Sequence, residues 1–116
     1  MKRTSIALVL LLAASGASAE MTVKQYLADR DAVNKSAFDR LVKPYLHGVG
    51  EGLVWANAQL KAQKGTPFFC DPDEVTLTAD EYLSVVDSET KQPYVEPEYP
   101  IELLLLKGLQ RKYPCK

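Results

Sequence analysis

The most extended amphipathic pattern lies in the middle of the chain. From Phe38 onward, apolar residues recur at steps of three and four, at Leu41, Val42, Tyr45, Leu46, Val49, Leu53, Ala56 and Leu60. This spacing puts them on one stripe of an α-helix. Ser36 is the predicted N-cap of this helix, and Gly65, followed by Thr66 and Pro67, is its predicted stop.

Shorter patterns predict helices on both sides of the long one. Thr22 can cap a first helix that ends near Asn34 and carries Val23, Tyr26 and Leu27 on one face. Thr78 and Glu81 fit a capping box for a helix that carries Tyr82, Leu83, Val85 and Val86.

The last helix is predicted from Ile101 to about Lys112 and contains four consecutive leucines, Leu103 to Leu106. A helix that is apolar on several sides is typical of a central core position or of a subunit interface. No alternating run exceeds a few residues, so the sequence predicts an all-α domain of about four helices with one long central helix.

Four residues in the long helix are unusual for a helix interior. Pro44 lacks a backbone donor and should bend the helix, unless the helix begins just before it. Gly48, Gly50 and Gly52 each cost up to about 1 kcal/mol relative to alanine. Because Gly48 and Gly52 lie on the same side, they predict close packing of a second helix, with a binding surface of exposed backbone as the alternative.

The first 19 residues have the pattern of a secretory signal peptide. Lys2 and Arg3 precede the apolar run from Ile6 to Ala14, and the small residues Ala17-Ser18-Ala19 follow it. The apolar run is about half the length that spans a bilayer. We therefore expect cleavage before Glu20, no membrane anchor afterwards, and a single mature domain over residues 20–116.

Charge and cysteine content narrow the function classes. The leader carries two of the 14 basic residues and none of the 15 acidic ones, so the mature net charge is −3. No basic patch interleaved with aromatics is present, which argues against a nucleic-acid partner. In an oxidising compartment Cys70 and Cys115 are expected to form one disulfide, with two free thiols as the alternative.

The sequence contains few candidates for catalytic residues. His47 is the only histidine, and no serine lies in a G-x-S-x-G or S-x-x-K motif. The calcium, phosphate and dinucleotide motifs are absent, and neither cysteine has a second ligand at metal spacing. The sequence therefore predicts no enzyme, no catalytic residue, no metal site and no cofactor.

One connection stands out as a candidate for binding a protein. Tyr94, Glu96, Glu98 and Tyr99 lie on a stretch stiffened by Pro97. Tyrosines supply contact area at low entropy cost, and proline limits the ordering penalty of binding. These four residues are the predicted partner-binding residues, with an ordinary surface linker as the alternative.

Taken together, these motifs resemble the Tai/Rap family of type VI secretion immunity proteins. The resemblance covers the chain from about Tyr26 to Cys115. It rests on Tyr45-Leu46-His47-Gly48-Val49, on Phe69-Cys70-Asp71-Pro72, on the leucine-rich stretch from Leu103 to Leu109, and on Tyr113-Pro114-Cys115.

The resemblance implies a small helical periplasmic protein, often a homodimer, that docks on a peptidoglycan amidase effector and blocks its active-site cleft. Cys70 and Cys115 would then be the family disulfide. The resemblance carries over no catalytic residue and does not place the inhibitory surface. The alternative function is an exported structural or chaperone-like helical protein with no toxin partner.

Overall fold

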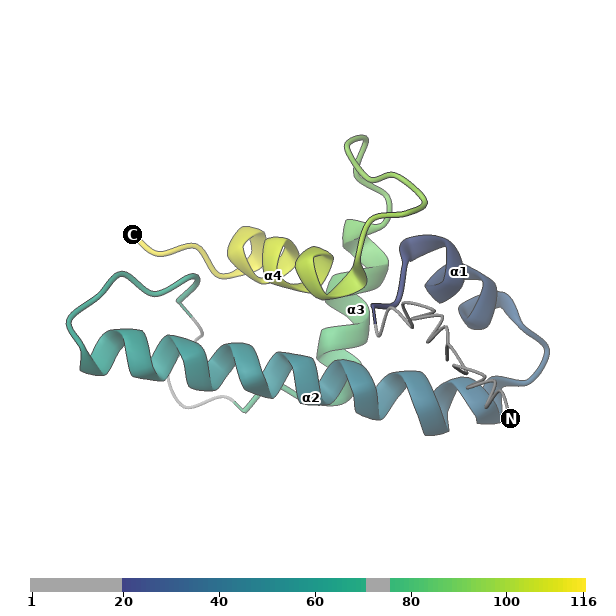
Figure 1. The fold of residues 1–116 in the computed structure, drawn as a ribbon, viewed down its shortest axis with the longest axis horizontal. Helices are drawn as coiled ribbons and strands as arrows, with labels where there is room; N and C mark the ends of the chain where they lie inside the picture. The colour runs from purple at the N-terminus through teal and green to yellow at the C-terminus, as the bar shows by residue number, and fades with distance from the viewer. Residues whose placement is uncertain (1–19, 71–75) are drawn as a thin grey trace, which may run out of the picture.

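The computed structural model describes residues 20–70 and 76–116, and these contain four helices (Figure 1). Their bounds are α1 Val23–Asp31, α2 Lys35–Ala62, α3 Ala79–Glu89 and α4 Ile101–Lys112. The predicted all-α fold with one long helix is confirmed. The predicted leader and its cleavage site fall largely outside the described residues, as do Asp71 and Pro72 of one cysteine motif.

The predicted start of α4 at Ile101 is confirmed, and of the three predicted N-caps two are confirmed and one is wrong. Thr22 caps α1 by accepting a hydrogen bond from the Gln25 amide (3.2 Å), and Thr78 and Glu81 form the complete capping box of α3. The N-cap of α2 is Asn34, whose side chain accepts from the Ala37 amide (3.2 Å), and Ser36 lies within the helix. Asparagine and serine are comparable caps, so propensity alone did not distinguish them.

The far ends of α1 and α2 come earlier than predicted. α1 ends at Asp31 rather than near Asn34, because Asn34 already serves as the cap of the next helix. α2 ends at Ala62, and Lys64 takes the left-handed conformation (φ 58°). The Gly65 amide then donates to the Leu60 carbonyl (2.8 Å), which closes the helix end.

α2 is one continuous helix of 28 residues, and Pro44 lies inside it. Pro44 is exposed, so the carbonyl that loses its helical partner can be hydrated. No helix within residues 20–70 and 76–116 is long and apolar enough to cross a bilayer.

The close helix approach occurs at a different glycine from those predicted. Gly48 and Gly52 are exposed, and apart from the adjacent residues and nearby backbone of α2 itself, no atom lies within 4 Å of the position that a Cβ would take at either one. Gly50 is buried, and a Cβ there would collide with the Tyr82 ring of α3. The prediction that a second helix packs on Gly48 and Gly52 is therefore wrong, because α3 crosses the opposite side of α2.

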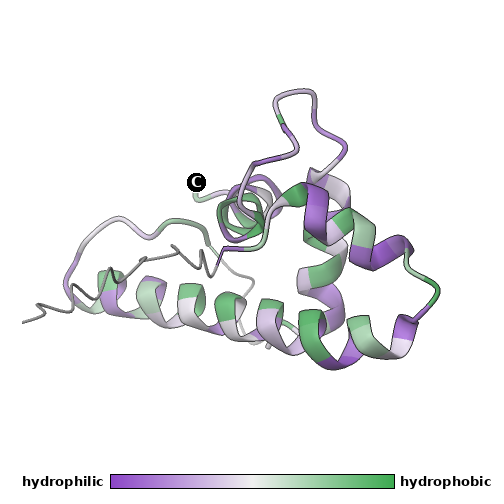
Figure 2. Cartoon of the chain, turned by 45° about the vertical axis from the view of Figure 1, so that its right-hand side comes forward, coloured by the Kyte–Doolittle hydropathy of each residue, from purple (hydrophilic) through white to green (hydrophobic). Residues whose placement is uncertain are grey.

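The core lies where α2, α3 and α4 meet, and α1 covers one end of it. Green and purple bands alternate along α2 in Figure 2, as expected for an amphipathic helix. Leu104 and Leu105 of the leucine run are fully buried, whereas Leu103 is exposed, so α4 has one buried face. The other fully buried apolar side chains are Tyr26, Leu46, Phe69, Tyr82, Val86, Ile101 and Leu109.

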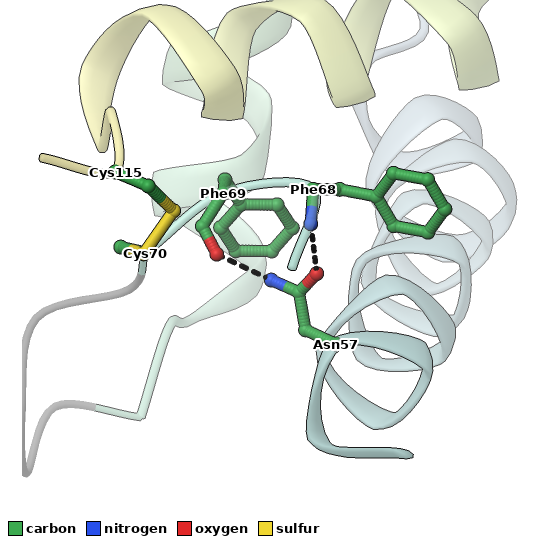
Figure 3. Close-up of a disulfide and its surroundings, with 5 residues drawn as sticks. All are labelled: Asn57, Phe68, Phe69, Cys70 and Cys115. Atoms are coloured by element: carbon green, nitrogen blue, oxygen red, sulfur yellow. Dashed lines mark hydrogen bonds between the residues drawn. A yellow bond between two sulfur atoms is a disulfide. The ribbon is translucent and has the colours of Figure 1, made fainter. Parts of the chain in front are cut away.

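A disulfide fastens the segment after α2 to the end of α4. Cys70 and Cys115 are bonded, with their Cα atoms 4.9 Å apart, which confirms the predicted pair (Figure 3). Beside it, Asn57 is 2% exposed and brackets the segment: its amide donates to the Phe69 carbonyl (2.7 Å), and its oxygen accepts from the Phe68 amide (2.8 Å). The Phe69 ring is thereby held in the core.

Candidate partner-binding loop

The connection between α3 and α4, residues 91–100, projects from the helical body (Figure 1). We call it the α3–α4 loop. Two short turns shape it: the Val95 amide donates to the Gln92 carbonyl (3.2 Å), and the Tyr99 amide donates to the Glu96 carbonyl (3.0 Å). Glu96 and Glu98 are exposed on the loop.

Tyr94 fastens the first half of the loop to the body. Its hydroxyl donates to the Glu89 carboxylate (2.5 Å), and its ring packs edge-on against that of Tyr99, with centroids 5.9 Å apart. The Lys107 ammonium lies 5.0 Å from the centre of the same ring. Burial and the bond to Glu89 raise the pKa of Tyr94 to about 12, so its hydroxyl remains a donor at neutral pH.

Glu89, at the end of α3, is the centre of this anchor. It is 2% exposed and accepts hydrogen bonds from Nε and Nη2 of Arg111, at 3.1 to 3.3 Å. Burial by itself raises the pKa of Glu89, but the bonds from Arg111 and Tyr94 outweigh it and leave the pKa lowered. Glu89 is therefore an ionised, fully partnered acceptor at neutral pH.

The first residues of α1 hold the second half of the loop. The Val23 amide donates to the Tyr99 carbonyl and the Lys24 amide to the Pro97 carbonyl, both at 2.9 Å. These bonds flank an isolated antiparallel bridge between Thr22 and Pro100. The loop is thus held in its first half by Glu89, at the end of α3, and in its second half by the backbone of Val23 and Lys24, which are distant in sequence.

The structure brings part of the predicted set together. Tyr94 and Tyr99 are in contact, while Glu96 and Glu98 lie outward without an ion pair to any residue in the described ranges. The sequence prediction missed Glu89, Lys107 and Arg111, which hold the loop from α3 and α4. No motif or spacing links these residues to Tyr94, because only the helix packing brings them together.

The other residues considered as candidates for catalysis or metal binding are His47 and the two cysteines. His47 is exposed on α2, with Nε2 3.9 Å from a Glu51 carboxylate oxygen and its ring 6.1 Å from that of Tyr82. The two cysteines are bonded, so neither offers a thiol. Across residues 20–70 and 76–116, no three His, Cys, Asp or Glu side chains gather as a metal site would require.

A second surface feature is an apolar groove of about 440 Å³ between α1 and α2. Its apolar lining includes Phe38, Leu41, Val42 and Tyr45 of α2, together with Met21, which precedes α1. Leu41 is 66% exposed, and Trp55, farther along α2, is 73% exposed. α2 therefore presents large apolar side chains to solvent.

Comparison with known proteins found no match to this chain. No protein-family model, no curated protein and no solved structure matches the chain.

Proposed function

We propose that this chain is a periplasmic immunity protein that binds a secreted peptidoglycan amidase and inhibits it by stoichiometric occlusion of its active-site cleft. The observation that supports this proposal is the projecting α3–α4 loop, held at one end by Glu89 and at the other by the Val23 and Lys24 amides. A loop fixed before binding loses little conformational entropy when it enters a cleft. This property suits an inhibitor.

The side chains on the loop suit a cleft with cationic groups at its rim. Glu96 and Glu98 are exposed and are not ion-paired within the described ranges, so little must be broken before they meet a cation. Tyr94 adds a partly exposed aromatic ring beside them. Complementary charge accelerates encounter and fixes register, while an aromatic anchor supplies affinity.

Two observations of different kinds support the proposed periplasmic location. The Cys70–Cys115 disulfide fits an oxidising compartment, and the leader pattern over residues 1–19 supplies the route out of the cytoplasm. The proposal assigns the inhibitory role to the mature domain 20–116. It needs no cofactor and no catalytic residue, because the protein acts by binding alone.

The first experiment is a pulldown of the tagged mature protein from periplasmic extract supplemented with any hydrolase encoded beside it. We expect a one-to-one complex with an amidase that stops cleaving cell wall. Recovery of the protein alone, with the candidate hydrolase fully active beside it, would contradict the proposal.

The loop's role is tested by reversing its charge. The variant Glu96→Lys with Glu98→Lys should weaken binding to the amidase by at least about tenfold, because it replaces attraction with repulsion at the interface. The matched control is Asp31→Lys with Asp39→Lys, which makes the same charge change at exposed positions on the ends of α1 and α2. Equal affinity of both variants, measured by titration calorimetry, would remove the loop from the interface.

A chaperone-like function is the second candidate, and the apolar groove between α1 and α2 favours it. Exposed Leu41 and Trp55 could contact unfolded chains without sequence specificity. On this alternative, the mature protein protects unrelated clients in proportion to its concentration, and Leu41→Ser with Trp55→Ser abolishes the protection. The loop variants would then have no effect.

A further inference from the structure

Glu102, in the first turn of α4, has an unusual carboxylate. One oxygen, Oε1, accepts from the Tyr45 hydroxyl and from the Met21 amide (3.3 Å). The other oxygen, Oε2, is buried and has no hydrogen-bond partner within the described ranges. Buried polar atoms nearly always have a partner, and a buried charged atom without one is costly.

The neighbours of this carboxylate do not supply the missing donor. Burial and the bond to Glu102 raise the pKa of Tyr45 to about 12, and the single proton of its hydroxyl is already directed at Oε1. The Glu20 carboxylate, which also acts on Tyr45, adds negative charge. The buried oxygen of Glu102 therefore still needs a donor, and a cationic donor would also compensate the charge of this carboxylate.

The predicted cleavage before Glu20 would create a cation there. Hydrolysis of the Ala19–Glu20 bond consumes one water and leaves a carboxylate on Ala19 and an amine on Glu20. That amine binds a proton at neutral pH, since an α-amino group has an ordinary pKa of about 7.7–8.0. The Glu20 amine is one residue before the Met21 amide, and that amide already contacts the Glu102 carboxylate. Because one residue spans at most about 3.6 Å, the amine lies within reach of the same carboxylate.

We propose that the α-ammonium of mature Glu20 docks on Oε2 of Glu102 and completes its hydrogen bonding. The ammonium has three donors and forms a charge-assisted bond that the neutral amide of the uncleaved chain cannot form. This inference rests on the predicted cleavage site and is independent of the amidase.

Docking would act on the residues that hold the α3–α4 loop. The Met21 carbonyl accepts from the Ile101 amide at the start of α4 (2.9 Å), and the Val23 and Lys24 amides bind the loop itself. An anchored Glu20 therefore restrains the segment that fastens both the loop and α4. Cleavage of the leader would complete the fold as well as release the protein.

The experiment is a cycle of four proteins, all with the disulfide formed. The mature chain beginning at Glu20 is compared with the same chain acetylated at Glu20, each with Glu102 or with Glu102→Gln. Acetylation should raise the unfolding equilibrium constant about tenfold when Glu102 is present and have little effect in Glu102→Gln. Equal stability of the free and acetylated chains with Glu102 would overturn the proposal.

A titration of the folded protein gives a second readout that does not need the variants to fold. Docking raises the folded pKa of the α-ammonium, so its stabilisation is complete below the unfolded value of about 7.7 and is lost as pH rises through the folded value. NMR of the Glu20 ¹⁵N signal should show this raised pKa. An ordinary pKa, or mass spectrometry showing that export leaves a different first residue, would overturn the proposal.

Discussion

At the scale of single residues, Glu89 decides the geometry of the α3–α4 loop. A carboxylate that is 2% exposed is tolerated only because Arg111 and Tyr94 direct three donor groups at it. Removing its charge leaves the Arg111 guanidinium without its partner and weakens the hold on the Tyr94 hydroxyl. The consequence reaches the loop, because Tyr94 is the loop's contact with α3.

Glu89→Gln should therefore change both stability and its dependence on pH. The folded pKa of Glu89 is lowered, so its stabilisation is present above the unfolded value of about 4.3 and is lost as pH falls through the folded value. We expect the variant to lose about 1–3 kcal/mol at neutral pH and to show a flatter acid limb in urea unfolding. The control is Glu98→Gln on the exposed loop, and an acid limb as steep in Glu89→Gln as in Glu98→Gln would contradict the prediction.

At the scale of elements, local signals in the sequence predicted well and long-range ones did not. The period of the apolar positions in α2 and the capping box of α3 depend on residues within a few positions of each other, and both were predicted. Which side of α2 meets α3 depends on the crossing of two helices. The sequence therefore predicted a close approach in α2 but assigned it to Gly48 and Gly52 instead of Gly50.

Gly50 and Gly52 give a matched test of that crossing. Gly50→Ala should destabilise the protein by about 1–3 kcal/mol, because its Cβ would meet the buried Tyr82 ring. Gly52→Ala should stabilise it by up to about 1 kcal/mol, because alanine is the better helix former and open space surrounds the position. Thermal unfolding measures both, and two changes of the same sign would mean that the crossing is misplaced.

For the whole molecule, the contacts that join distant parts of the chain lie near the two ends of the described residues. Near their start, Met21, Val23 and Lys24 hold the α3–α4 loop and the start of α4. Near their end, Cys115 is bonded to Cys70. The sequence predicted the disulfide because the chain has only two cysteines, but nothing in it predicted the contacts near the start, since backbone amides carry no residue-specific signal.

Because the disulfide is separate from the contacts that hold the α3–α4 loop, removing it should change the stability of the protein rather than its binding. Cys70→Ala with Cys115→Ala opens a link across 45 residues, which contributes up to about 4 kcal/mol in the chain-entropy model. We expect a large drop in the urea midpoint, because a small domain has only about 5–15 kcal/mol in total. Reduction of the wild-type protein should cause a similar drop.

The helices should nevertheless form without the bond. The Asn57 bracket still holds Phe68 and Phe69, and the Cys70 amide donates to the Tyr113 carbonyl (2.8 Å) through backbone atoms that the substitution leaves in place. The α3–α4 loop is held by hydrogen bonds of Glu89, Val23 and Lys24, and none of these bonds involves Cys70 or Cys115. The double variant should therefore keep its helical circular dichroism and, if the proposed function holds, its affinity for the proposed amidase partner at temperatures where it is folded. Loss of affinity in a fully helical double variant would place part of the binding surface near the disulfide.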